Sequence, residues 1–336
     1  MFSINKVFIL LLLSQIFLLF KKDDLRQYAI HGYAQGTDYS IKYFARDSIV
    51  TKKNIDSILI VIDSSMSLYK SYSLINKFNA SKDGIILDPH FTKVIIKSFE
   101  VYKATKGKFD ITVEPLVQAW GFGAKPIDKF PDSGQVKELL ECVGMNNLSL
   151  KGNFLKKKKQ CINVDLNGIA QGYSVDVVAD YLIKKGIASF VVEIGGELRV
   201  KGPKPDGTSM HIGIEGPADS PNAEPVVRHV MSIKEGAITT AGNYRKYLQK
   251  GSKKIAHLID PKTGYPLDNS LISVTIYAKD AITADGYDSP IMAMNVKEAL
   301  DFIAAKKNME AYIIYHRKDG SVTDTLTAGF KKMIAD

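Results

Sequence analysis

Three oxygen-bearing side chains in the last fifth of the chain have a spacing that suits chemistry. Asp285, Asp288 and Ser289 occupy positions i, i+3 and i+4, which lie on one side of a helical turn. Carboxylate and hydroxyl oxygens are ligands for hard divalent cations. A plainer interpretation is that the two aspartates are helix N-terminal charges favoured by the helix dipole. The spacing therefore predicts an oxygen-rich cation site, with helix-end charges as the alternative.

His257 is the histidine whose setting best suits proton transfer. It lies where a predicted strand runs into the turn at Ile259–Pro261, and such a turn can aim a side chain at a site. Histidine ordinarily titrates at about pH 6.5, which makes it a suitable general base. The other histidines fall in no comparable motif, and the sequence contains neither a Gly-x-Ser-x-Gly elbow nor a His/Cys cluster with zinc spacing.

Six stretches of the chain combine polar residues and glycine next to apolar strands. Their composition predicts that they are too polar for the core and belong to a site, although each one alone is a weak signal, since such residues are common in turns. Nucleotide fingerprints of the Gly-x-Gly-x-x-Gly or P-loop type are absent from the sequence. The stretches are 33–43, 109–123, 164–176, 192–202, the pair 237–247 and 257–267, and 283–289.

The order of these motifs resembles the ApbE family, the FAD:protein FMN transferases, over residues 30 to 315. A chance match to all of the family's motifs in the same order is very improbable. The matching positions are Gly36–Thr37, Asp110–Leu116 followed by Trp120–Phe122, Asp165–Asp176, Gly195–Gly196, Thr240–Tyr244, His257–Gly264, and Ala284–Asp285 with Ser289.

The resemblance implies an enzyme that cleaves FAD, attaches FMN through a phosphoester to a Ser or Thr hydroxyl of an acceptor protein, and releases AMP. It implies Mg²⁺, or Mn²⁺ in its place, held by Asp285, Asp288, Ser289 and the carbonyl of Gly168. It assigns His257 as the base that deprotonates the acceptor hydroxyl. The acceptor is expected to be a subunit of an electron-transfer complex. Contacts with FAD are implied at Gln35, Tyr69 (with Tyr72 as a neighbouring alternative), Asp110, Ile111, Thr112, Asp165, Gln171 and Ile259.

Three positions depart from the family's pattern. Ser289 stands for the usual threonine and keeps the hydroxyl, whereas Gln171 stands for a frequent lysine and removes one charge, although an amide can still donate hydrogen bonds. Pro290 predicts a kink, or a new helix with Ser289 as its N-cap. Two other activities stay open: an FAD pyrophosphatase, in which water replaces the acceptor hydroxyl, and a flavin-binding protein without turnover.

Apolar periodicity predicts the elements that must position these residues. Helices and strands alternate without a regular βαβ period, which favours an α+β fold with mixed β-sheets, surrounding helices and FAD in a cleft of one catalytic domain, residues 28–336. Helical spacing occurs at 53–67, 91–105, 134–143, 174–185 and 296–306. Strand patterns occur at 39–45, 190–194, 197–201, 211–215, 226–234, 270–278 and 311–315.

Residues 1–27 are predicted to be an export signal or a membrane anchor. The stretch Val7–Phe20 is almost entirely apolar and follows Lys6, which is the layout of a secretory signal, although it is short for a membrane span. Neither a cleavage site of small residues nor a cysteine for a lipid anchor follows it. The expected location is the periplasm or the periplasmic face of the inner membrane, with cleavage or retention of the segment left open.

Composition excludes several classes of protein. With 45% hydrophobic and 24% charged residues, the chain is globular rather than disordered. The net charge of +9 is scattered, and its one true run, Lys156–Lys159, suits a solvated loop better than a nucleic-acid surface. Two cysteines exclude a disulfide scaffold and a four-cysteine zinc site. Cys142 and Cys161 are compatible both with a disulfide and with two free thiols.

Overall fold

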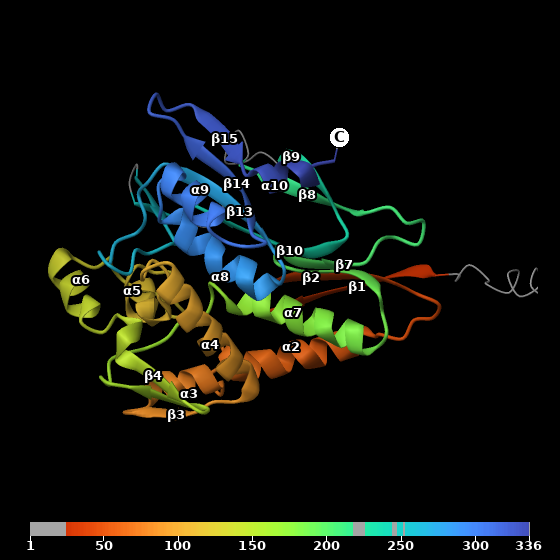
Figure 1. Cartoon of the computed structure of the whole chain (residues 1–336). Coiled ribbons are helices and arrows are strands. Elements are labelled where there is room, and N and C mark those ends of the chain that lie inside the picture. Colours follow the sequence, from red (N-terminus) through yellow and green to blue (C-terminus); the bar gives the residue numbers. More distant parts are fainter. Residues whose placement is uncertain (1–24, 218–225, 244–246, 251–252, 336) are drawn as a thin grey trace, which may run out of the picture.

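An eight-stranded antiparallel sheet forms the centre of the computed structural model, which describes residues 25–217, 226–243, 247–250 and 253–335 (Figure 1). The α+β class predicted from the sequence is confirmed, and every strand pairing among the described residues is antiparallel. In spatial order the sheet contains β1 (Arg26–Ala34), β2 (Thr37–Ala45), β6 (Ser189–Ile194), β7 (Glu197–Lys201), β10 (Glu235–Gly242), β13 (Leu271–Ala278), β14 (Glu310–His316) and β15 (Val322–Leu326).

Both faces of this sheet are covered, which explains why its central strands are apolar on both sides. In β13, Val274 and Ile276 face the main core, whereas Tyr277 packs against a second apolar cluster. Alternate residues of a strand point to opposite faces. The run of β-branched residues in this strand is therefore the pattern of a strand buried on both sides.

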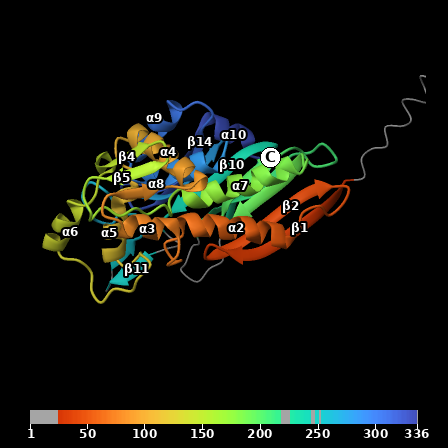
Figure 2. The ribbon, with the colours of Figure 1, turned by 90° about the horizontal axis from the view of Figure 1, so that it is seen from below.

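Helices cover one face of the sheet, and α2 runs along the outside of that layer (Figures 1 and 2). The five helices expected from periodicity are present, with ends that differ by a few residues. The helices are α2 (Lys52–Met66), α3 (Leu74–Ala80), α4 (Pro89–Ala104), α5 (Glu114–Ala119), α6 (Ser133–Leu140), α7 (Ala170–Lys184), α8 (Ala281–Met292), α9 (Val296–Ala304) and α10 (Ala328–Met333), with 3-10 turns η1 (Ile111–Val113) and η2 (Met145–Asn147). None of the helices among the described residues is long and apolar enough to cross a membrane.

The opposite face is covered by the hairpin of β8 (Met210–Gly216) and β9 (Val226–Ile233) together with α10. Two smaller sheets complete the fold: β3 (Gly84–Ile86), β5 (Phe154–Lys157) and β4 (Leu148–Lys151) form one, and β11 (Tyr247–Lys250) and β12 (Lys253–Ala256) form the other. The apolar stretch Val7–Phe20, predicted to be an export signal or anchor, lies outside the described residues.

Helix α8 carries the proposed cation ligands, and it is one continuous helix. Asp280 is its N-cap, accepting a hydrogen bond from the amide of Thr283, and Pro290 lies inside its last turn. The expectation that Ser289 caps a new helix is therefore wrong; the next helix, α9, is capped by Asn295. Pro290 has no N–H to donate to the carbonyl four residues before it, so the last turn of α8 lacks that hydrogen bond.

The interface between α7 and α8 depends on Gly172. A Cβ atom at this position would lie 2.4 Å from the carbonyl oxygen of Ala281 and 2.6 Å from the Cβ of Asp285. Asp176, one turn further along α7, accepts hydrogen bonds from the amides of Ala281 and Ile282 and so caps the start of α8. Arg199 of β7 pairs with Asp176 at 2.9 Å. Residues of the motif 164–176 thus hold α8 against α7.

Two of the polar stretches are buried, contrary to the expectation that they are too polar for the core. Residues Ala237–Thr239 are almost fully buried in the central strand β10, and much of α7 from Gly172 onward is buried as well. Both stretches are rich in small residues, which let α8 pack closely against α7 and β10. The small polar residues of these stretches therefore contribute to close packing between elements as well as to the site.

Cys142 and Cys161 form a disulfide, with 5.5 Å between their Cα atoms. The bond joins the chain after α6 to the segment after β5. Among the alternatives left open by the sequence, the structure therefore has the paired one.

Candidate active site

A cavity of about 1030 Å³ opens between the helical layer and the end of the large sheet. Its volume is at the upper end of the range for small-molecule sites, roughly 300–1,000 Å³. Every site residue predicted from the sequence lines it except Thr112. These lining residues are Gln35, Tyr69, Asp110, Ile111, Asp165, Gly168, Gln171, His257, Ile259, Asp285, Asp288 and Ser289.

Thr112 lies behind the cavity wall and supports it. Its side chain is fully buried, and its hydroxyl donates to the carboxylate of Asp110 while accepting a hydrogen bond from the amide of Gly144 at 2.6 Å. A direct contact between this side chain and FAD is therefore not available. The resemblance implies a contact with FAD at this position, whereas the 3-10 turn places the side chain in the interior.

Asp110 lines the cavity, but its carboxylate is occupied by the protein. It accepts hydrogen bonds from the amide of Thr112 at 2.8 Å and from the amide of Met145 at 3.0 Å. Burial raises the pKa of Asp110, and these hydrogen bonds partly offset that shift. The side chain thus acts as the N-cap of η1 and holds the segment that follows the disulfide.

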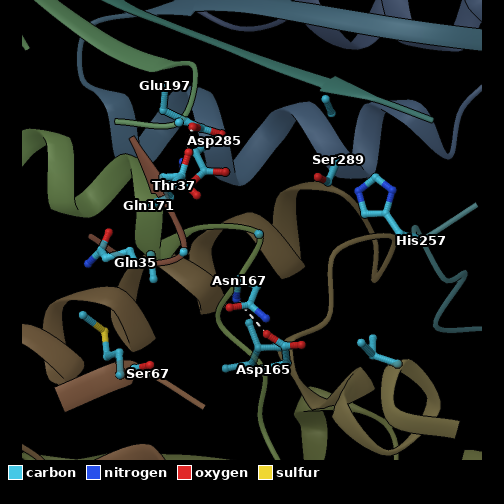
Figure 3. A pocket seen from close by; sticks show the side chains of 18 of the residues that line it. Gln35, Thr37, Ser67, Asp165, Asn167, Gln171, Glu197, His257, Asp285 and Ser289 are labelled. Atoms are coloured by element: carbon cyan, nitrogen blue, oxygen red, sulfur yellow. Dashed lines mark hydrogen bonds between the residues drawn. The ribbon is translucent and has the colours of Figure 1, made fainter. Parts of the chain in front are cut away.

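Asp165 and Asn167 form a loop on the opposite side of the cavity from α8 (Figure 3). The carboxylate of Asp165 accepts a hydrogen bond from the amide of Asn167 at 2.8 Å, and the amide of Asp165 donates to the carbonyl of Ile111 at 2.7 Å. These bonds position the start of α7 and the adjoining Gly168, whose carbonyl belongs to the predicted ligand set.

Tyr69 and Gln35 lie toward the open side. The side chain of Tyr69 is 60% exposed and lines the cavity, whereas Tyr72, the neighbouring alternative, is not among the lining residues. Gln35 has a φ of 55° in the turn between β1 and β2, and its amide donates to the hydroxyl of Ser174 at 3.0 Å. This bond ties the turn to α7 and keeps it over the cavity.

The carboxylates of α8 line the cavity and are nonetheless buried. Asp285 is 4% and Asp288 is 3% exposed, because α8 is covered by α7, α4 and the sheet. Burial raises the pKa of Asp285 to about 7, and burial together with the neighbouring Asp285 raises the pKa of Asp288 well above its ordinary value. A nearby positive charge would strongly stabilise the ionised form of two buried carboxylates at this spacing.

The residues present fit a hard divalent cation. Asp285 Oδ2 accepts a hydrogen bond from the amide of Gly172 at 2.7 Å, while Oδ1 makes no hydrogen bond within the described residues. Ser289 Oγ lies 3.1 Å from Asp288 Oδ1. No trio of His, Cys, Asp and Glu side chains in the described part of the chain is arranged to hold a metal. The set consists instead of two carboxylates, a hydroxyl and a backbone carbonyl, all oxygen donors.

His257 follows β12 directly and faces the Ser289 side of α8 across the cavity (Figure 3). Its ring makes an edge-on contact with Phe122, with ring centroids 6.3 Å apart. Trp120, which precedes this aromatic residue in the motif, donates from Nε1 to the carbonyl of Gly264 and packs in an apolar cluster beneath the 257–267 segment. The two motifs therefore position the imidazole jointly.

Comparison with known proteins agrees with this geometry. The profile of the ApbE family matches residues 35–313. The chain belongs to the ApbE family. It is 35% identical to the FAD:protein FMN transferase of Haemophilus influenzae over 318 residues, which cover 91% of each chain. It is 33% identical to the protein of the same name from Vibrio cholerae, covering 92% of this chain and 93% of the relative.

Solved structures of ApbE proteins have the same fold. The flavin transferase ApbE from Vibrio cholerae superposes with a TM-score of 0.82 at 34% identity, covering 92% of this chain and 99% of that one. The apo form of the Pseudomonas stutzeri flavinyl transferase ApbE gives a TM-score of 0.81 at 28% identity, covering 92% and 97%. The α+β architecture of this chain is therefore that of the ApbE family.

Glu197 and Thr37 are among the cavity residues to which the sequence assigned no role. Glu197 begins β7, immediately after the Gly195–Gly196 turn, and lines the cavity beside Asp285. Thr37, in the matched Gly36–Thr37 pair, lies close to the same turn. The available signal was a charged residue directly after a Gly-Gly turn, which alone is too common to indicate a site.

Proposed function

We propose that this protein is a Mg²⁺-dependent transferase that moves FMN from FAD to a Ser or Thr hydroxyl of an acceptor protein and releases AMP. The observation that carries the proposal is that a single cavity brings His257, the Asp285–Ser289 face of α8 and the loops at 110–111 and 165–168 together. The names of the curated ApbE relatives support flavin transfer.

The proposed reaction is a displacement at phosphorus. The acceptor hydroxyl oxygen bonds to the phosphorus of the FMN half while the bond from that phosphorus to the bridging oxygen breaks, and AMP leaves with the bridging oxygen. His257 takes the hydroxyl proton, since a neutral alcohol is a weak nucleophile. The loops around Asp165 and Gln35 orient the dinucleotide, and positioning supplies a large part of the catalysis in phosphoryl transfer.

Asp285, Asp288, Ser289 and the Gly168 carbonyl would hold the cation. When bound, Mg²⁺ supplies positive charge next to the pyrophosphate oxygens, where negative charge develops. The two buried carboxylates of α8 create the demand for that charge. Their hard oxygen donors would also accept Mn²⁺.

The cellular setting is part of the proposal. The apolar stretch Val7–Phe20 supports export to the periplasm or to the periplasmic face of the inner membrane. The paired Cys142 and Cys161 agree with an oxidising compartment. The acceptor would then be an exported segment of an electron-transfer subunit, because a covalently attached flavin serves as a redox centre.

Incubation of the protein with FAD and Mg²⁺ tests the reaction. AMP release that depends on an acceptor protein, with flavin covalently attached to that protein, supports the transferase. AMP release at the same rate without acceptor indicates an FAD pyrophosphatase. FAD binding without AMP release indicates a flavin-binding protein, and full activity in chelator would contradict the metal assignment.

Affinity for the intact dinucleotide provides a second test. FAD should bind more tightly than FMN, because the AMP half adds contacts along the cavity. Titration calorimetry that gives equal affinities for both would contradict the location of the site.

A further inference from the structure

Glu197 adds a third carboxylate to the α8 end of the cavity. It is the first residue of β7, is half-buried and lines the cavity. Figure 3 shows its side chain next to Asp285. Burial raises the pKa of Glu197 well above its ordinary value, and the carboxylates of Asp285 and Asp288 raise it further.

The partner of Glu197 is neutral. Gln171 Nε2 donates to Glu197 Oε2 at 2.6 Å and to the carbonyl of Ile194 at 2.8 Å. These two bonds use both hydrogens of the amide nitrogen. Both hydrogens of Gln171 Nε2 are thus donated within the protein, and a hydrogen bond from this nitrogen to FAD would replace one of them.

The orientation of this amide is held by packing as well. A Cβ atom at Gly195 would lie 2.0 Å from Gln171 Nε2, so the glycine turn fits directly against the amide. Gly195 has a φ of 60°, which an ordinary side chain rarely adopts. The Gly-Gly turn thus positions the Gln171–Glu197 pair.

These three carboxylates have no cationic partner among the described residues. Among the described residues, no lysine, arginine or histidine forms an ion pair with Glu197, Asp285 or Asp288. Three lysines also line the cavity: Lys52 and Lys70 lie on the α2 side, whereas Lys108 donates to the carbonyl of Ala293, just after α8, at 3.0 Å and pairs with Glu298. Within the described part of the chain, the three carboxylates therefore share one end of the cavity without an ion pair to a cationic side chain.

We propose that Glu197 is a positioning residue of the cation site, and that its charge, uncompensated by the neutral Gln171, strengthens Mg²⁺ binding without direct ligation. The inference rests on the proposed function, because it concerns the cation of that site. A carboxylate behind the ligands attracts the cation through space. Residues in this position ordinarily contribute about 10–100-fold to metal affinity.

Mg²⁺ titration of the FAD-free protein at pH 8 tests the inference, with calorimetry or thermal stabilisation as the readout. Glu197→Gln removes the charge, and Gln171→Lys compensates it. Both should weaken Mg²⁺ binding about 10–100-fold. Glu235→Gln is the matched control, since it removes an exposed carboxylate of β10 that pairs with Lys201, and its Mg²⁺ affinity should equal that of the wild type.

Melting temperatures in EDTA distinguish an electrostatic role from a structural one. Relief of repulsion among the carboxylates should leave Glu197→Gln and Gln171→Lys at least as stable as the wild type without metal, even though they bind Mg²⁺ more weakly. A variant that melts lower in EDTA and binds Mg²⁺ like the wild type would overturn the inference. The inference would also be overturned if both variants bound Mg²⁺ with the affinity of the wild type. The same holds if the wild-type protein bound no Mg²⁺ in the absence of FAD.

The proposed function fails in a different way. It is contradicted if the wild-type protein releases no AMP when it is incubated with FAD, Mg²⁺ and an acceptor protein. A wild type that labels its acceptor, while both variants bind Mg²⁺ as it does, overturns the role of Glu197 alone.

Discussion

Replacing Gly172 by alanine should destabilise the protein and disable the site together. The added Cβ would lie 2.4 Å from the carbonyl oxygen of Ala281 and 2.6 Å from the Cβ of Asp285, so α7 and α8 must move apart. Overpacking of this kind costs about 1–3 kcal/mol. The 2.7 Å hydrogen bond from the Gly172 amide to Asp285 Oδ2 would lengthen, and a hydrogen bond to a charged group is worth about 1.5–3 kcal/mol.

One effect opposes this loss. Alanine is favoured over glycine inside a helix by about 1 kcal/mol. The sum is a loss of roughly 3 kcal/mol in the free energy of unfolding. FMN transfer should fall as well, because Asp285 moves with the helix.

Equilibrium unfolding in urea and AMP release are the two assays. Gly213→Ala is the matched control, because a Cβ there would lie 3.5 Å from the side chain of Val227, an ordinary contact. This control should stay within about 0.5 kcal/mol of the wild type. A Gly172→Ala protein as stable and as active as this control would refute the packing argument for α8.

Three further outcomes follow from the site and its supports. The His257→Ala variant should still bind FAD, as measured by calorimetry, and its rate of FMN transfer should fall about 10²–10⁴-fold. A variant rate near that of the wild type would show that another group takes the proton. A wild-type rate that does not change between about pH 5.5 and 8 would show the same. Burial raises the pKa of Asp285 to about 7 in the folded protein, so in EDTA the folded state retains a proton that the unfolded chain releases, and the contribution of this carboxyl to the free energy of unfolding should fall as pH rises from about 4 to 7. Asp288, whose pKa is also raised, contributes in the same direction, so Asp285→Asn should reduce the decline and lower transfer about 100-fold or more while the fold persists, and an unchanged pH dependence in urea would count against the assignment. Replacing both Cys142 and Cys161 by serine should lower the free energy of unfolding by about 3 kcal/mol for a loop of this length. It should also weaken FAD binding, because the amides of Gly144 and Met145 hold the 110–112 turn. Unaltered FAD affinity in the double variant would show that the disulfide does not support the site.

Several features of this protein follow from its sequence alone because they depend on local spacing. The i, i+3, i+4 spacing of Asp285, Asp288 and Ser289 predicts a common face in any helix. The continuous apolar run of β13 likewise predicts a buried strand. The order of the motifs indicates the ApbE family, since each motif is read along the chain. These patterns predicted the α+β class, and nearly all of the site residues that they predicted line the cavity.

Tertiary structure decided what depends on residues far apart in the chain. Gly172 and Asp285 are 113 positions apart, and only their packing shows why a glycine is needed and why the carboxylate is buried. Thr112 belongs to one of the motifs, yet its side chain points away from the cavity, because its hydrogen bonds with Asp110 and Gly144 hold it in the interior. Periodicity describes which face a residue lies on, and it carries no information about what another segment places against that face.

The role of Glu197 shows the same limit. In sequence it is a charged residue after a Gly-Gly turn, and nothing local distinguishes it from a surface glutamate. In the folded chain, Gln171 donates to it at 2.6 Å and α8 brings Asp285 alongside. A charge acts through space on whatever the fold places within several ångströms, so the electrostatics of the site became visible only once β7, α7 and α8 were assembled.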